Sequence, residues 1–178
     1  MHSEHDYFEY LYNLSVVTIA FVGLAGLYIG FKTADKMTKF DALITRNHYV
    51  LSFAVVGACL LPPFLSVVLP WTPSRLNLQD RYWGVASGIA AITPILFSVT
   101  YRWTRRRVTG KKMPAGTVVL LFLYFFAALP LVFNACQNSA ALFVFGMTLQ
   151  QAINILTFLY ALKYVLAVPK AGKRKRAR

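Results

Sequence analysis

The stretch that decides the fold spans residues 113–162 and reads MPAGTVVLLFLYFFAALPLVFNACQNSAALFVFGMTLQQAINILTFLYAL. It holds two apolar windows without a charge, 113–136 and 140–162, joined by a short polar turn at residues 134–139. A helix of about 20 apolar residues crosses the roughly 30 Å hydrocarbon core of a bilayer, so each window predicts one membrane span. Because the turn is short, the two helices are expected to be antiparallel neighbours.

Three further charge-free windows of similar length precede this stretch, at residues 10–31, 49–70 and 82–101. The chain is 57% hydrophobic and 14% charged, whereas a soluble domain is about 45–50% apolar and 25% charged. A soluble globular protein is thereby excluded. The sequence predicts an all-α integral membrane protein, a bundle of five transmembrane helices within residues 10–168, between an acidic outer tail (1–9) and a basic cytoplasmic tail (169–178).

Basic residues orient the five spans, because Lys and Arg in short loops remain in the cytoplasm. Almost all of the 19 Lys and Arg residues fall in the loops 32–48 and 102–112 and after residue 162. These segments share one membrane face only if the number of spans is odd. We therefore expect the N-terminus outside and the C-terminus in the cytoplasm, with the first span retained rather than cleaved. Such a bias is typical of a bacterial inner (plasma) membrane.

The formal net charge of +13 is thus concentrated on the cytoplasmic face and predicts contact with membrane lipids that carry anionic headgroups. Each Lys or Arg near such a surface contributes about 1 kcal/mol of attraction. Binding of nucleic acid by the polybasic C-terminus is the less favoured alternative. The residues expected to contact anionic lipid are Arg105, Arg106, Arg107, Lys173, Arg174, Lys175 and Arg176.

Uncharged polar residues form a stripe in the fifth span. Gln150, Asn154 and Thr157 recur at helical spacing and share one face, with Gln151 beside them. One interpretation is hydrogen bonding between helices, since a buried amide in lipid needs a partner. The other is that the stripe lines a pore or a polar cavity. The first span offers further candidates for this lining, Asn13, Ser15 and Thr18.

Small residues and prolines mark the packing of the helices. Glycine allows close approach of two helices, which in the first span applies to Gly23, Gly26 and Gly30 and in the third to Gly84 and Gly88. These faces either pack inside the bundle or join subunits. Proline removes a backbone hydrogen bond and tends to kink a helix. Kinks are expected at Pro62, Pro63, Pro94 and Pro130, and the adjacent pair either bends or unwinds its span.

The loop before the second span has its own helical pattern around Met37, Phe40 and Ile44. It predicts a short interfacial helix, either separate or continuous with that span. His48 follows, and we interpret it as an interfacial residue, with a pH-sensitive gate as the alternative.

Charged side chains are absent from all five windows. Proton pumps, ion-coupled transporters and voltage sensors depend on such charges, so these classes are disfavoured. The sequence shows no set of nucleophile, base and orienting group, and we expect neither an enzyme nor a bound cofactor. His2, His5 and Asp6 make only a weak metal-binding pattern, so no metal is expected.

These features lead to two hypotheses about function. The centre of a five-helix bundle is filled by side chains, so a pore would require several subunits. The leading hypothesis is an oligomeric channel or permeation-pathway subunit with an uncharged polar lining and a basic cytoplasmic mouth. The alternative is a non-conducting accessory or scaffold subunit of a larger membrane complex, docked through its glycine faces.

Overall fold

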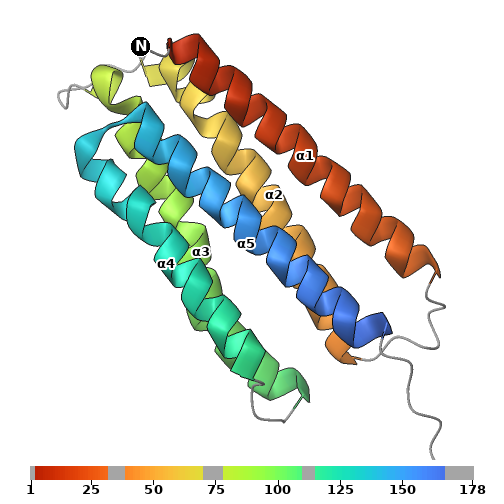
Figure 1. Cartoon of the computed structure of the whole chain (residues 1–178). Coiled ribbons are helices and arrows are strands. Elements are labelled where there is room, and N and C mark those ends of the chain that lie inside the picture. Colours follow the sequence, from red (N-terminus) through yellow and green to blue (C-terminus); the bar gives the residue numbers. More distant parts are fainter. Residues whose placement is uncertain (1–2, 32–38, 70–77, 110–114, 167–178) are drawn as a thin grey trace, which may run out of the picture.

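The computed structural model describes residues 3–31, 39–69, 78–109 and 115–166. These ranges contain five long helices and one short 3-10 turn. The helices are α1 (Glu4–Phe31), α2 (Lys39–Val68), α3 (Tyr82–Thr109), α4 (Ala115–Gln137) and α5 (Ala140–Leu166), with the turn η3 (Leu78–Arg81) before α3 (Figure 1). The predicted all-helical bundle is confirmed.

Each of the five helices is long and apolar enough to span a membrane. Their candidate spans are Glu4–Leu27, Thr45–Val68, Tyr82–Arg105, Gly116–Gln137 and Ala140–Tyr160. The protein is therefore a multipass helical membrane protein, as the hydropathy predicted. Which membrane it occupies, and with which orientation, stay predictions.

Several helices extend beyond the apolar windows. Most of the acidic segment 1–9 belongs to α1, which starts at Glu4. From Lys39 on, the helical pattern before the second span is continuous with that span, because α2 begins there, whereas Met37 lies outside the described residues. With 28 residues, α1 is about 42 Å long. This length matches the 40–45 Å of a bilayer with its headgroups, so the polar helix ends have a place at the interface.

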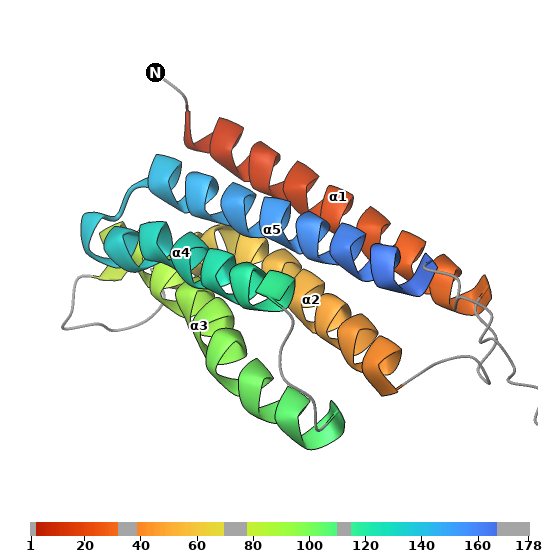
Figure 2. The same ribbon diagram turned by 60° about the horizontal axis from the view of Figure 1, so that its bottom comes forward.

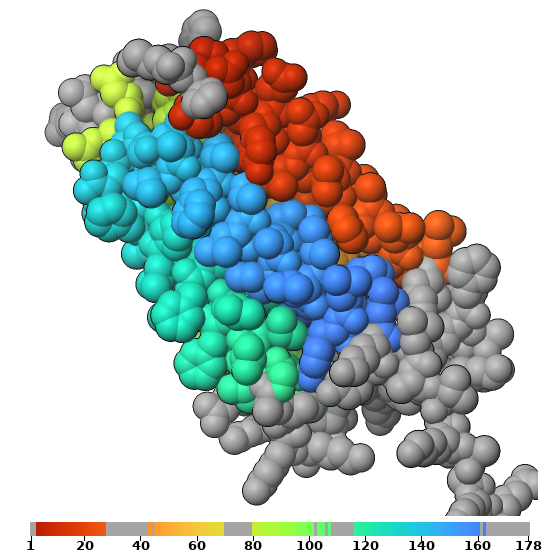
Figure 3. Space-filling model, viewed as in Figure 1, coloured from red at the N-terminus to blue at the C-terminus, as the bar shows by residue number. Residues whose placement is uncertain are grey.

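Helix α5 lies at the centre of the arrangement. It runs between α1 and α4, while α2 and α3 pack behind (Figures 1 and 2), and it contacts all four other helices. Helices α4 and α5 are antiparallel neighbours, as predicted. In the space-filling view α1, α4 and α5 close over one face of the bundle (Figure 3). We call its two ends the Asn138 end, where α1 begins and α4 turns into α5, and the Arg105 end.

Large apolar side chains cover the outside of the bundle. Val67, Val99 and Phe122 are each at least 60% exposed, as suits a surface that contacts lipid. The inside contains many small and polar residues, for example Ala86, Ala127 and Ser87, which are fully buried. Lipid tails are as apolar as leucine, so close packing and hydrogen bonds hold the helices together rather than the hydrophobic effect.

Three glycines permit the closest approaches between helices. A Cβ atom at Gly84 would lie 2.9 Å from the backbone oxygen of Ala135, so the backbones of α3 and α4 approach each other closely here. A Cβ atom at Gly146 would lie 2.7 Å from Leu131 Cδ2. At Gly116 it would meet the ring of Tyr160. The α3–α4 and α4–α5 interfaces therefore depend on the absence of a side chain at these positions.

The turn between α4 and α5 is fixed by two asparagines. Asn138 has a φ of 55°, a left-handed conformation that asparagine tolerates better than most residues. Its Oδ1 accepts a hydrogen bond from the Gly84 backbone N–H at 2.8 Å, and its Nδ2 donates to the Asp80 carbonyl. Fully buried Asn134 bonds Ser87 Oγ and the backbone of Ser139. The turn is thereby attached to the start of α3.

Candidate functional site

The predicted polar stripe faces the interior of the bundle. Asn154 Nδ2 donates a 2.8 Å hydrogen bond to Ser52 Oγ of α2. The Tyr124 hydroxyl of α4 donates a longer one, 3.5 Å, to Asn154 Oδ1. Asn154 and Ser52 are fully buried and Tyr124 is 3% exposed. One amide of α5 thus connects two other helices, and we call the residues Ser52, Tyr124, Gln150, Gln151 and Asn154 the polar layer.

Two amides of the polar layer are not satisfied by the protein. Gln150 and Gln151 are 5% and 2% exposed. Within the described part of the chain, no group pairs with Gln150 Nε2, Gln151 Nε2 or Gln151 Oε1. A buried unpaired polar group costs about 1–3 kcal/mol. These atoms are therefore ready to hydrogen-bond a small polar molecule that enters the bundle.

His48 belongs to the same interior and was not expected there. It is 3% exposed, and its ring stacks on Phe158 of α5 with centroids 5.0 Å apart. Its ring lies near the Asn154 side chain, although neither ring nitrogen makes a hydrogen bond of good geometry with a described residue. Helix α2 therefore turns this side chain inward, while its position at the membrane interface stays a prediction.

The remaining candidates for the lining lie elsewhere or are already bonded. Ser15 and Thr18 are buried, but their hydroxyls donate to the carbonyls of Leu11 and Leu14 in their own helix. Thr157 likewise donates to the Ile153 carbonyl. Asn13 is exposed on the outer surface of α1. The structure brings Gln150, Gln151 and Asn154 into the interior and leaves Asn13 outside it.

The predicted glycine faces have different surroundings. Gly84 and Gly88 both face Ala135, so this pair packs inside the bundle. A Cβ atom at Gly26 would lie 3.3 Å from the Tyr49 hydroxyl, whereas one at Gly23 would meet nothing within 4 Å. The surroundings of Gly30 lie outside the described residues.

The prolines lie within unbroken helices. Helix α2 is continuous through Pro62 and Pro63, so the hypothesis that this pair unwinds the span is wrong. Pro94 and Pro130 are likewise enclosed in α3 and α4. The kinks themselves stay predictions.

Of the arginines expected at the headgroups, two have described side chains. Arg107 is exposed, and its guanidinium carbon lies 3.4 Å from the centre of the Trp103 ring. Arg105 is only 5% exposed and follows Tyr101 by one helical turn. The side chains of Arg106, Lys173, Arg174, Lys175 and Arg176 lie outside the described residues. Arg105 therefore places a positive charge among the packed helices, close to the end of α3.

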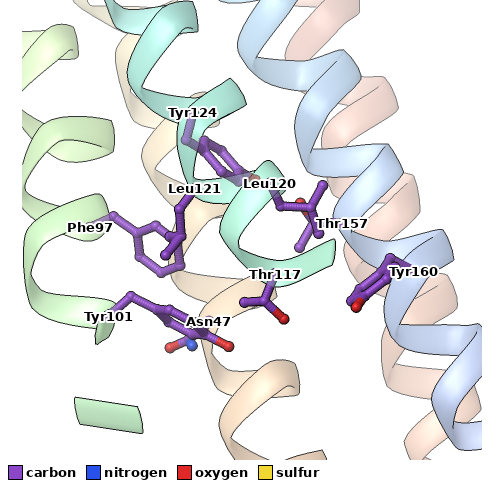
Figure 4. A pocket seen from close by; sticks show the side chains of 9 residues that line it. All are labelled: Asn47, Phe97, Tyr101, Thr117, Leu120, Leu121, Tyr124, Thr157 and Tyr160. Atoms are coloured by element: carbon purple, nitrogen blue, oxygen red, sulfur yellow. The ribbon is translucent and has the colours of Figure 1, made fainter. Parts of the chain in front are cut away.

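A pocket lies beside the polar layer, toward the Arg105 end (Figure 4). It has a volume of about 430 Å³, its open side included, and it is bordered by α2, α3, α4 and α5. Tyr124 borders the pocket and also bonds Asn154, so it joins the pocket to the polar layer. The lining residues are Asn47, Phe97, Tyr101, Thr117, Leu120, Leu121, Tyr124, Thr157 and Tyr160.

Sequence reasoning missed this pocket, because its walls come from four helices whose register no local pattern gives. The one available signal is the pair of tyrosines close to span ends, Tyr101 and Tyr160, both of which line the pocket. Within the described residues, no three His, Cys, Asp or Glu side chains come together as metal ligands would.

Comparisons with protein-family models, with curated proteins and with solved structures find no match to this chain. The arrangement of its own side chains is therefore the basis for a functional proposal.

Proposed function

We propose that this protein provides a permeation pathway for a small, uncharged polar solute. The observation that carries the proposal is the pair of buried glutamines, Gln150 and Gln151, whose two amide nitrogens and the Oε1 of Gln151 lack protein partners in the described chain. Amides exchange hydrogen bonds with water and with small polar solutes at little cost. The candidate spans supply no acidic residue to this interior, so a cation has no counter-charge there.

The route that this proposal implies lies inside one protomer. Gln150 and Asn154 face the interior of the bundle, so a pore between subunits would not meet them. Leu131, Phe143 and Met147 are fully buried nearer the Asn138 end and close that half of the bundle. Transport therefore requires a movement of α5 relative to α2 and α4. An oligomer, which a pore between subunits would need, is not required by this route.

Solute flux into liposomes tests the proposal. Reconstituted protein is expected to accelerate the entry of glycerol or urea, measured by stopped-flow light scattering. Gln150→Leu and Gln151→Leu should each reduce the protein-dependent rate at least tenfold. Asn13→Leu is the control, because it replaces an exposed amide outside the interior by the same residue. Equal rates in all four proteins, or no rate above empty liposomes, would contradict the pathway.

A second candidate function, a non-conducting accessory subunit, is favoured by one feature of α1. Gly23 is exposed and no atom lies within 4 Å of its Cβ position, so a helix of another subunit has room to approach closely. Gly23→Leu should then disrupt co-purification with a partner. Gly57→Leu is the control, since Gly57 is exposed on α2 with equal space. Gly88 is unsuitable as a probe because it packs inside the bundle.

A further inference from the structure

His48 adjoins the polar layer, because it lies one helical turn before Ser52 on α2. Both residues contact α5. The His48 ring stacks on Phe158 with centroids 5.0 Å apart and lies near the Asn154 side chain. Ser52 Oγ accepts the 2.8 Å hydrogen bond from Asn154 Nδ2. Together these contacts hold α2 against α5 at the level of the polar layer.

The neighbours of the His48 ring are mostly aromatic. Tyr49 of the same helix lies 6.3 Å away between ring centroids, and Phe158 in turn contacts Phe21 of α1. On the adjacent face of α2, Asn47 lines the pocket, to which α3, α4 and α5 contribute three tyrosines: Tyr101, Tyr124 and Tyr160. These groups offer a positive charge no carboxylate.

The described charges toward the Arg105 end are positive. Arg46, two residues before His48, is exposed, and Arg105 is buried in α3. The carboxylates whose side chains the structure describes lie toward the Asn138 end, in α1 and η3: Glu4, Asp6, Glu9 and Asp80. The side chains of Asp35 and Asp41 lie outside the described residues. A protonated His48 thus has no described counter-ion, and a buried charge without a partner is strongly destabilising.

Protonation also changes the hydrogen bonds that the ring can make. A neutral imidazole has one donor and one acceptor, whereas an imidazolium has two donors. The amide oxygen beside the ring is Asn154 Oδ1, which accepts the 3.5 Å bond from Tyr124. If this oxygen turns to an imidazolium, Asn154 gives up its bonds to both Ser52 and Tyr124.

We propose that protonation of His48 releases Asn154 from Ser52 and Tyr124 and so loosens α5 against α2 and α4. Because the permeation pathway requires this movement of α5, acid should open the pathway; this regulation rests on the proposed function. An ordinary histidine changes its charge near pH 6.5. A comparison of pH 8 with pH 5.5 therefore tests the switch.

Unfolding by sodium dodecyl sulfate tests the loosening without transport. The wild-type midpoint should lie at a lower detergent fraction at pH 5.5 than at pH 8, because the unfolded chain accepts the proton without burying it. His48→Gln should have one midpoint at both pH values. His5→Gln is the matched control, since it removes an exposed histidine, and should behave as wild type. A shift in His48→Gln as large as that of wild type would overturn the switch.

A second protein keeps the test independent of the folding of His48→Gln. The chain has three histidines, so His2→Gln combined with His5→Gln leaves His48 as the only one. Its midpoint should shift with pH as that of wild type does. An unchanged midpoint would overturn the switch.

Urea flux into liposomes separates the switch from the pathway. Wild type should transport urea at least threefold faster at pH 5.5 than at pH 8, and His48→Gln equally fast at both. Equal wild-type rates at the two pH values would overturn the regulation and leave the pathway in place. Rates no higher than those of empty liposomes at either pH would contradict the pathway itself, and its regulation with it.

Discussion

Asn154 shows how one side chain contributes both to stability and to a candidate site. Its amide bonds Ser52 across to α2 and receives a bond from Tyr124 of α4. The two interpretations of the polar stripe, helix packing and polar lining, therefore apply to different members. Asn154 is used in packing, whereas the neighbouring Gln150 and Gln151 keep unsatisfied atoms.

Loss of the Ser52 hydroxyl should destabilise the bundle. Ser52→Ala leaves the buried Asn154 Nδ2 without its acceptor, and hydrogen bonds between membrane helices contribute on average about 0.6 kcal/mol, with a maximum near 1.7. We expect a decrease of about 1 kcal/mol in the free energy of unfolding, measured by titration with sodium dodecyl sulfate. Ser66→Ala is the control, because Ser66 Oγ bonds the Pro63 carbonyl of its own helix and no other helix of the described chain. Equal effects of the two substitutions would contradict the role of the interhelical bond.

Among the elements, α3 and α4 form the interface that depends most on a small residue. Gly84 brings α3 against the backbone of Ala135, and Asn138 caps the same region through the Gly84 N–H. The glycine spacing in the third span predicted that such a face exists. It did not predict the partner, because only the structure brings Ala135 opposite Gly84.

Adding one methyl group at this interface should separate the two helices. Gly84→Ala places a Cβ atom 2.9 Å from the Ala135 carbonyl oxygen, and overpacking of this kind costs about 1–3 kcal/mol. Gly57→Ala has open space and should be neutral or stabilising by up to about 1 kcal/mol through helix propensity. Thermal unfolding followed by circular dichroism compares the two. A Gly84→Ala protein as stable as the Gly57→Ala protein would contradict the close contact.

Hydropathy was sufficient to predict five spans because the lipid bilayer requires an apolar segment of this length to be helical. Every backbone group in lipid must be bonded within a helix, so span-length apolar windows such as 113–136 become helices whatever their neighbours. The burial of His48 and Arg105 was not predictable in this way. Both lie near span ends, and only the length of the helices that continue past the apolar windows decides whether such side chains face inward.

The site was predictable only in part, because the sequence does not show which helices pack against each other. Helical spacing placed Gln150 and Asn154 on one face, but not which helices that face would meet. Asn13 has the same chemistry and is exposed, since its face of α1 is uncovered in the bundle. The close contacts at Gly116 and Gly146 escaped notice because their partners, Tyr160 and Leu131, come from another helix.

For the whole molecule, the predicted orientation is testable with the native cysteines. Cys136 is exposed near the Asn138 end, whereas Cys59 is buried. If the N-terminus is outside, a membrane-impermeant maleimide should label right-side-out vesicles and leave sealed inverted vesicles unlabelled. Cys136→Ser should abolish the signal. Labelling of inverted vesicles alone would reverse the orientation derived from the basic loops.

The two hydrogen bonds between Asn138 and the start of α3 also impose an order on biosynthesis. Gly84 leaves the ribosome 54 residues before Asn138, so α3 enters the membrane long before its cap exists. Until α4 has crossed and Asn138 follows it, the Gly84 N–H and the Asp80 carbonyl lack the side chain that bonds them in the finished protein. We expect the start of α3 to become fixed only when the α4–α5 hairpin packs against it and Asn138 forms these bonds.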